Sequence, residues 1–327
     1  MSAIRYGIAG QPVQHSLSPL LMAIVCDHLG MDVNGKQLRM ELVEVDSMTD
    51  ALAWGYAGAV PSPVEWTYTR SVFGKFRTSA LLSKAVEAAR LVKHAAPAFL
   101  PVDGVVEPSP AASRVEGLPT RMFEKEIWLN LTAPLKHQLV SSAVMSVDDS
   151  METKSVNTLR WDGRGWWCGG FDGEGVVDVL RHHGVVPDKH VLGLHGGGGG
   201  ARSTASAWAK LGGALTLLES RRVLEEGVWS SALCNQPAHA VVDFDDRSEA
   251  NDNVLRLSAT YGPMKGTVEE RTTLLDGRLL DGRWLLVAQH LVCWRRLWSP
   301  ERSDELPSLG LLMTKLVEAE TVLGAYA

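Results

Sequence analysis

Two short segments place a lysine and an aspartate where each could take part in proton transfer. Lys136 ends the segment NLTAPLK (130–136), in which a strand-like run gives way to a predicted helix. Asp172 stands in FDG (171–173), at the start of another predicted helix. An ammonium and a carboxylate that meet in a pocket can exchange a proton with a substrate, with the carboxylate orienting the ammonium. Taken singly, each is more typical of a solvated surface charge, so the prediction depends on a fold that brings the two together.

A dense polar turn, GQPVQHSLSP (10–19), precedes the first predicted helix. Its hydroxyls at Ser16 and Ser18, close to the N–H groups of a helix start, are suited to binding a carboxylate. An N-cap followed by a turn uses the same residue types. The sequence leaves both interpretations open.

A run of five glycines lies between a buried strand (191–194) and a helix. The segment HGGGGGAR (195–202) fits the pattern GxGxxA. In that pattern Gly196 makes the tight turn, Gly198 lets the backbone approach a pyrophosphate, and Ala201 lets the helix pack on the strand. The alternative is a flexible glycine loop without a ligand.

Two charged residues after the next predicted strand (214–218) bear on the choice of dinucleotide. A carboxylate at Glu219 would bind a ribose 2′-OH and repel a 2′-phosphate, which favours NAD. An arginine such as Arg221 could clamp a 2′-phosphate, which favours NADP. Both cofactors stay open at this point. The predicted cofactor-binding residues are Gly196, Gly198, Gly199, Ala201, Glu219 and Arg221.

The elements that must position these residues alternate between strands and helices. Predicted strands cover 5–9, 38–45, 127–131, 191–194, 214–218, 241–242 and 255–259, a hairpin covers 156–168, and predicted helices cover 19–29, 79–94, 136–145, 173–183 and 203–211. Such alternation implies parallel pairing in a doubly wound sheet. Prolines interrupt the pattern from about 55 to 125, which indicates an insertion flanked by loops.

Length and composition restrict the class of protein. The chain has 327 residues, 45% of them hydrophobic and 21% charged, which favours two globular domains. A net charge of -6 argues against a nucleic-acid partner, and no run of about 18–20 apolar residues indicates a membrane span. The four scattered cysteines predict neither disulfides nor a metal site, and they favour a cytoplasmic protein with buried thiols.

The motifs HSLSP, NLTAPLK, SVNT, FDG, the glycine loop, YGP and GRWLLVAQ, in this order, resemble the shikimate dehydrogenase family. The resemblance implies an α/β fold of two domains, an N-terminal α/β substrate domain and a Rossmann doubly wound parallel-sheet domain. The implied bounds are 1–155 (with the insertion at about 55–125) for the substrate domain, 156–285 for the NAD(P)-binding domain, and 286–327 for C-terminal helices that pack back on the first domain. The implied reaction is the reversible reduction of 3-dehydroshikimate to shikimate or a related cyclic hydroxy acid, with NADP or less often NAD. A small-molecule substrate is the implied partner, and a homodimer is compatible with the resemblance.

The resemblance also implies roles for individual residues. Lys136 matches the catalytic acid/base, and Asp172 matches the aspartate that pairs with it. The residues that match substrate-binding positions are Ser16, Ser18, Thr132, Asn157 and Gln289.

The sequence departs from the family pattern at several places. The motif NTDG reads GFDG (170–173), so that Phe171 stands beside the key aspartate, and VVDFDDRS (241–248) replaces the family's NxTxxG loop near the nicotinamide. These differences leave two alternatives open: a specialised-metabolism homologue that acts on another cyclic substrate, and a non-catalytic binding protein of the same fold.

Overall fold

The computed structural model describes residues 3–32, 37–57, 66, 75–92, 97–105, 118, 125–247 and 254–325. Most of the predicted insertion at 55–125 therefore lies outside the described residues. Within it, the helix predicted at 79–94 corresponds to α3 (Lys75–Leu91).

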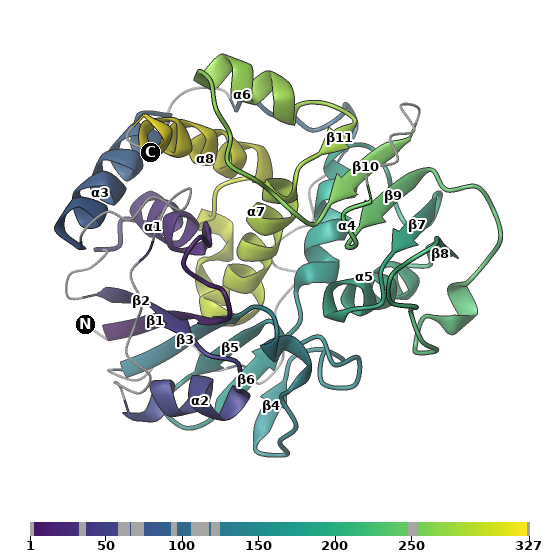
Figure 1. Cartoon of the computed structure of the whole chain (residues 1–327), viewed down its shortest axis with the longest axis horizontal. Coiled ribbons are helices and arrows are strands. Elements are labelled where there is room, and N and C mark those ends of the chain that lie inside the picture. Colours follow the sequence, from purple (N-terminus) through teal and green to yellow (C-terminus); the bar gives the residue numbers. More distant parts are fainter. Residues whose placement is uncertain are drawn as a thin grey trace.

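The first sheet has six strands in the order β2-β1-β3-β5-β6-β4 (Figure 1). Their bounds are β1 Ala3–Gly10, β2 Leu38–Glu44, β3 Lys125–Leu131, β4 Val144–Ser146, β5 Thr158–Trp161 and β6 Trp166–Gly169. The central strand β1 is parallel to β2 and β3, while β5 runs antiparallel to β3 and β6. The predicted strands at 5–9, 38–45 and 127–131 and the hairpin at 156–168 are all present.

Helices lie on both faces of this sheet. On one face, α2 (Met48–Ala57) buries Trp54 against Leu129 and Leu159. On the other, α1 (Ser18–His28) is buried along nine consecutive residues, because the sheet and further helices surround it. A helix that is apolar on all sides is expected to lie inside the protein.

The prediction of a helix at 136–145 is wrong. After β3 the chain makes one 3-10 turn, η4 (Leu135–His137), and then enters β4, which pairs with β6. Val140 is 89% exposed and Met145 46% exposed, so the segment has no continuous apolar face that a helix could bury.

The second sheet is wholly parallel, with strand order β11-β10-β9-β7-β8. Its strands are β7 Val191–His195, β8 Ala214–Leu217, β9 Ala240–Asp243, β10 Leu255–Ser258 and β11 Leu279–Leu280. The chain passes from β7 through α5 (Gly199–Lys210) to β8, and then returns to pair β9 with the other edge of β7. The direction of the crossovers therefore reverses at β7, which is where open α/β sheets bind ligands, beyond the carboxyl ends of the strands.

The predicted boundary at residue 155/156 needs correction. Strands β5 and β6 complete the first sheet, so that this sheet extends to Gly169. The hairpin stays there because β5 forms backbone hydrogen bonds with β3. The helix α4 (Asp172–His182) then leads from the first sheet to the second (Figure 1).

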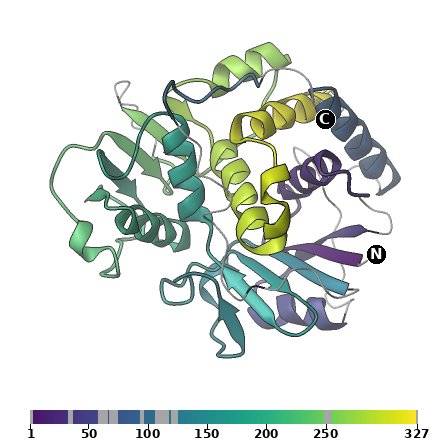
Figure 2. The same ribbon diagram turned by 180° about the vertical axis from the view of Figure 1, so that it is seen from behind.

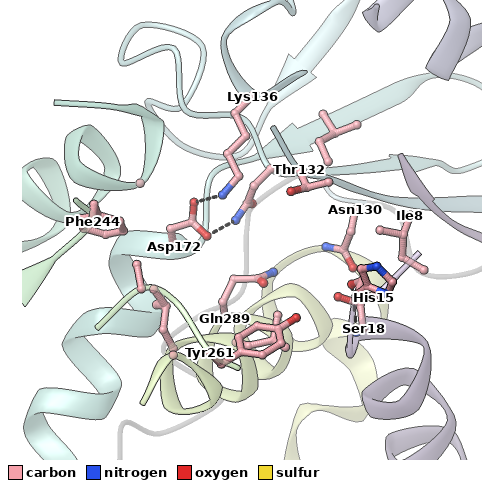
Figure 3. Close-up of a pocket in the computed structure, with 18 of the residues that line it drawn as sticks. Ile8, His15, Ser18, Asn130, Thr132, Lys136, Asp172, Phe244, Tyr261 and Gln289 are labelled. Carbon is pink, nitrogen blue, oxygen red and sulfur yellow. Dashed lines mark hydrogen bonds and ion pairs between the residues drawn. The ribbon is translucent and has the colours of Figure 1, made fainter. Parts of the chain in front are cut away.

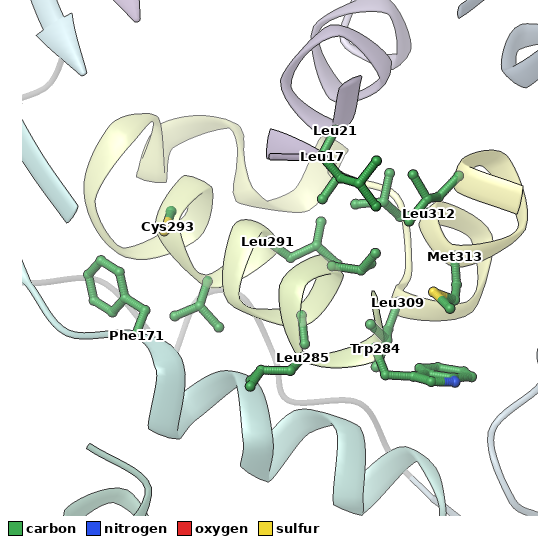
Figure 4. Packing of buried hydrophobic residues seen from close by; sticks show 14 of the residues in the cluster. Leu17, Leu21, Phe171, Trp284, Leu285, Leu291, Cys293, Leu309, Leu312 and Met313 are labelled. Carbon is green, nitrogen blue, oxygen red and sulfur yellow. The ribbon is translucent and has the colours of Figure 1, made fainter. Parts of the chain in front are cut away.

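The C-terminal part begins with α7 (Gly282–Cys293), so the predicted boundary at 285/286 falls inside a helix. A π-helical turn, η6 (Trp294–Trp298), the 3-10 segment η7 (Pro300–Glu305) and α8 (Leu309–Gly324) follow. α7 packs against α4, α1 and α8, and α8 packs against α1 and α3 (Figures 2 and 4). The helix α6 (Val268–Leu275), which the sequence did not predict, also contacts α8.

All four cysteines are free thiols. Cys26, Cys168 and Cys293 are buried as predicted, whereas Cys234 is half-buried. Within the described ranges, no helix has the length and apolarity to cross a bilayer. The described side chains also form no cluster of three or more potential metal ligands.

Two buried histidines are expected to make the fold sensitive to acid. Burial lowers the pKa of His182 to about 4 and that of His290 to about 3. The unfolded chain, with histidine pKa values near 6.5, therefore binds more protons than the native state below that pH. We expect the free energy of unfolding to fall as pH drops from about 6.5 toward 4, by at most about 1.4 kcal/mol per pH unit for each histidine.

Urea denaturation between pH 7 and pH 4.5 checks this expectation. His182→Gln should make the decline in unfolding free energy less steep, because it removes one native group that resists protonation. The exposed His137 provides the control, since His137→Gln should leave the slope unchanged. Equal slopes for the wild type and His182→Gln would contradict the assignment.

Candidate active site

One pocket of about 450 Å³ lies where the two sheets and α7 approach one another (Figure 3). This volume lies in the range of small-molecule sites. The pocket is lined by every residue predicted to be catalytic or substrate-binding, namely Ser16, Ser18, Thr132, Lys136, Asn157, Asp172 and Gln289. The fold therefore brings together residues that lie more than 250 positions apart in the sequence, such as Ser16 and Gln289.

A lysine–aspartate–asparagine cluster forms one wall of the pocket. Lys136 Nζ lies 2.6 Å from Asp172 Oδ2, and Asn157 Nδ2 donates to Asp172 Oδ1 at 2.9 Å (Figure 3). The Lys136 side chain is 29% exposed and that of Asp172 is 9% exposed. The carboxylate is therefore held on both oxygens, while the ammonium keeps access to the pocket.

Local structure explains how these three groups meet. Lys136 lies in the 3-10 turn that follows β3, and Asn157 immediately precedes β5, which pairs with β3. Asp172 is the first residue of α4, where the positive end of the helix dipole stabilises a carboxylate. Asn157 Oδ1 also accepts the backbone N–H of Phe171 at 3.0 Å, which fixes the entry into α4.

The opposite wall comes from the turn before α1. Ser16 and Ser18 both line the pocket, and Ser16 Oγ accepts the backbone N–H of Ser18 at 3.2 Å. The N-cap of α1 is Leu17, which makes no side-chain capping hydrogen bond, so Ser16 makes a contact within the turn and both serines line the pocket. Tyr261 joins this wall, since its hydroxyl accepts the backbone N–H of Leu17 at 3.3 Å.

Behind Gln289 lies a buried polar cluster that sequence reasoning missed. Gln289 Nε2 lies 2.8 Å from Cys293 Sγ, and Thr158 Oγ1 lies 3.1 Å from the same sulfur. Asn130 accepts the Tyr6 hydroxyl at 2.6 Å and lines the pocket. Burial raises the pKa of Cys293 to about 12 and also raises the pKa of Tyr6, so both remain neutral near pH 7.

Several pocket residues were not singled out from the sequence. These are Ile8, Pro12, His15, Asn130, Leu131, Gly200, Phe244, Ala259, Tyr261, Gly282, Leu285 and Leu286. Several of them stand in the quoted motifs, since His15 begins HSLSP, Asn130 begins NLTAPLK and Tyr261 begins YGP. The apolar members carry no signal of their own, because apolar residues in the sequence predict a core equally well.

The glycine turn lies against the same pocket. Gly196 has a φ of +117°, and Gly198 is the N-cap of α5. Gly200 lines the pocket, while a methyl group on Gly199 would lie 3.4 Å from Lys136 Cβ. The predicted packing position Ala201 is 1% exposed. The amino end of α5 is therefore next to the Lys136–Asp172 pair.

Several known proteins are similar to the chain in sequence. No family model matches the chain. The shikimate dehydrogenase (NADP(+)) of Methylibium petroleiphilum is 28% identical over 282 residues, which cover 83% of this chain and 89% of that protein. The enzyme of the same name from Alteromonas mediterranea is 35% identical over 149 residues, 45% of this chain and 50% of that protein.

Solved structures share the fold. Shikimate dehydrogenase from Aquifex aeolicus superposes with a TM-score of 0.52 at 16% identity, covering 96% of this chain and 97% of that one. Shikimate 5-dehydrogenase from Thermus thermophilus, in complex with NADP(H) and shikimate, gives 0.51 at 17% identity, covering 95% and 98%. The chain is therefore similar to shikimate dehydrogenases in sequence and shares their fold.

The departure from the family at Phe171 raised the expectation of an altered substrate pocket, and the structure places the ring elsewhere. Phe171 is fully buried and packs on Gly169, where a methyl group would lie 2.3 Å from the ring (Figure 4). It is absent from the pocket lining. Phe171 therefore supports the core behind Asp172 and does not contact a ligand in the pocket.

The second departure from the family does reach the pocket. Phe244, in the segment that replaces the NxTxxG loop, lines the cavity and packs on Gly200, where a methyl group would lie 2.5 Å from the ring. The aspartate before it in the same segment is buried, since Asp243 is 2% exposed and forms an ion pair with Arg256.

The crossing of α4 and α7 yields a testable prediction about pocket geometry. A methyl group on Gly175 would lie 2.8 Å from the backbone nitrogen of Gln289, so the two helices could not keep their present distance. We expect Gly175→Ala to destabilise the protein by about 1–3 kcal/mol and to raise KM more than it lowers kcat, because Gln289 is displaced. Denaturation and steady-state kinetics measure both effects. The control is Gly277→Ala, whose methyl group has its nearest neighbour at 3.9 Å.

Proposed function

We propose that the protein catalyses the NADP-dependent reversible reduction of 3-dehydroshikimate to shikimate, or of a closely related cyclic hydroxy acid. The observation that carries the proposal is the Lys136–Asp172 pair, which opens into the same pocket as Ser16, Ser18 and Gln289. Two relatives bear the name shikimate dehydrogenase (NADP(+)). An oxidoreductase of this kind is the function that the site supports best.

The polar residues divide the work between binding and proton transfer. Ser16 and Ser18 supply hydroxyls for a substrate carboxylate, while Asn157 and Gln289 supply amides for ring hydroxyls. Reduction of a ketone leaves negative charge on its oxygen, and a positioned ammonium can neutralise it. Lys136 Nζ would give its proton to that oxygen during reduction and take it back during oxidation.

Asp172 and Asn157 would act on the orientation of the ammonium. The 2.6 Å contact from Lys136 Nζ to Asp172 holds the lysine side chain on the pocket side of the wall. Asn157 in turn holds the second carboxylate oxygen at 2.9 Å. A donor fixed in this way loses little conformational freedom when the substrate binds.

The glycine turn fits the pyrophosphate of a dinucleotide. Open space surrounds the α-carbon of Gly198, and α5 directs its free backbone N–H groups from this end. When bound, the nicotinamide would supply the hydride. Arg221, in the loop after β8, is the residue that we propose to favour NADP over NAD.

Spectrophotometry at the nicotinamide band tests the proposal. Purified protein should reduce NADP+ when shikimate is present, and it should reduce NAD+ more slowly. Without shikimate, neither cofactor should be reduced. Quinate and amino-shikimate serve as alternative substrates. Turnover of one of them without turnover of shikimate would favour the specialised-metabolism homologue, and silence with all of them would contradict the proposed function.

The non-catalytic alternative has one specific observation in its favour, the Phe244 ring against Gly200 at the amino end of α5. Calorimetric titration separates it from the enzyme. Shikimate binding without binding of either dinucleotide would support a binding protein, whereas micromolar binding of NADP+ would exclude its simplest form.

A further inference from the structure

Two loops meet above the glycine turn at the point where a dinucleotide is expected. The β8 loop (residues 218–223) and the β9 loop (residues 244–247) follow strands on either side of β7. Because the crossovers reverse direction at β7, the crevice between these loops is the ligand site of such a sheet. The contacts between the loops therefore lie across the path of the cofactor.

Two pairs of residues join the loops. Arg247 Nη1, from the β9 loop, lies 3.2 Å from Glu219 Oε1 of the β8 loop. Asp245 Oδ2 accepts the backbone N–H of Arg221 at 2.6 Å, and the Arg221 guanidinium donates to the carbonyl of Asp245. We call these two contacts, Glu219–Arg247 and Arg221–Asp245, the loop bridge.

The β8 loop also covers the glycine turn itself. Ser220 Oγ accepts the backbone N–H of Gly196 at 2.7 Å. A methyl group on Gly197 would lie 2.2 Å from the carbonyl oxygen of Val223. The N–H of Gly196 and the space above Gly197 are therefore already used by the β8 loop, and Gly198 at the amino end of α5 is the open part of the turn.

The β9 loop is the fixed side of the bridge. The buried Asp243 carboxylate accepts the backbone N–H groups of Asp245 at 2.9 Å and Arg247 at 2.8 Å, and it forms an ion pair with Arg256. By contrast, Arg221 in the β8 loop is exposed, and the Glu219 side chain is 87% exposed. Opening therefore involves displacement of the β8 loop from a rigid partner.

We propose that the loop bridge is a closed latch over the dinucleotide crevice, which the 2′-phosphate of NADP releases by replacing the Asp245 carbonyl on the Arg221 guanidinium and the Glu219 carboxylate on Arg247. The inference rests on the proposed NADP dependence. Exposed ion pairs are weak, so the latch opens at small cost. NAD lacks the 2′-phosphate, so its binding also requires the free energy of opening the latch but gains neither arginine contact. The latch thus makes Arg247 a specificity-determining residue together with Arg221.

Equilibrium titration of the full chain with NADP+ and NAD+, followed by calorimetry, tests the latch. Asp245→Asn weakens the bridge without removing an arginine, so the apparent Kd should fall about threefold for both dinucleotides, because the open state becomes more populated. Arg247→Gln should raise the Kd for NADP+ about tenfold without raising that for NAD+. Glu226→Gln removes an exposed charge nearby that takes no part in the bridge, and should change neither Kd.

The outcomes separate this inference from the proposed function. Binding of NADP+ to the wild type with an unchanged Kd in Asp245→Asn would overturn the latch and leave the function intact. An equal loss of affinity for both dinucleotides in Arg247→Gln would overturn the role of Arg247 as the phosphate contact. Absence of binding by the wild type and by Asp245→Asn would contradict the proposed function, and the latch with it.

Discussion

Replacing Lys136 by Ala should lower kcat/KM for shikimate about 1,000-fold, because a positioned general acid–base contributes roughly 100- to 10,000-fold. The described part of the pocket contains no second lysine or arginine that could take over the proton, since Lys136 alone among its lining residues carries an ammonium or guanidinium. The loss should fall mainly on kcat, because Ser16, Ser18 and Gln289, which we propose to bind the substrate, are unchanged. Steady-state kinetics with NADP+ measure it.

Binding experiments and a matched lysine separate this loss from misfolding. The Lys136→Ala protein should retain the wild-type Kd for NADP+ and raise the Kd for shikimate by no more than about 150-fold, since one hydrogen bond to a charged group is worth about 1.5–3 kcal/mol. Lys189 is exposed and does not line the pocket, so Lys189→Ala should keep full activity. More than a tenth of wild-type activity in Lys136→Ala would mean that another group delivers the proton.

The sequence was sufficient to predict the pocket because its polar residues stand at element ends. Lys136 follows β3, Asn157 precedes β5 and Asp172 begins α4, and strand pairing brings these ends together. The ends of these strands and helices can be predicted from turn and strand residues within a short stretch of sequence. The order of the motifs then allowed seven residues to be assigned to one cavity before its geometry was known.

Long-range packing explains what could not be predicted. The helix expected at 136–145 gave way to a 3-10 turn and β4, because pairing with β6 replaced the local helical hydrogen bonds. Phe171 stands beside the key aspartate in sequence and left another substrate open, yet its ring packs against Gly169 and does not line the pocket. The loop bridge depends on Asp243, which appeared in the sequence as one member of an acidic run. Each case turns on a partner far away in the chain or on the direction of a side chain.

Breaking the buried ion pair between α7 and α8 by removing one partner should strongly destabilise the protein. Arg283 Nε lies 2.6 Å from Glu320 Oε2, and both side chains are 2% exposed. Arg283 also contacts Asp281, the N-cap of α7, at 3.0 Å and donates to the carbonyl of Gly262 at 2.8 Å. The interactions with Glu320 and Asp281 raise the pKa of Arg283 despite its burial. The guanidinium therefore joins three segments, one of which carries Gln289.

Glu320→Leu should cost about 3–5 kcal/mol of unfolding free energy, because it leaves the Arg283 charge buried with less compensation. The double variant Arg283→Met/Glu320→Leu should recover part of that loss, since two apolar side chains avoid the desolvation of either charge. Glu305→Leu breaks an exposed pair with Arg302 and should cost under about 1 kcal/mol. The double variant could instead have a lower unfolding free energy than Glu320→Leu, by as much as Arg283→Met costs alone. The two residues would then act independently. In that case the pair would not be the link through which α8 holds α7, and with it Gln289, against the pocket.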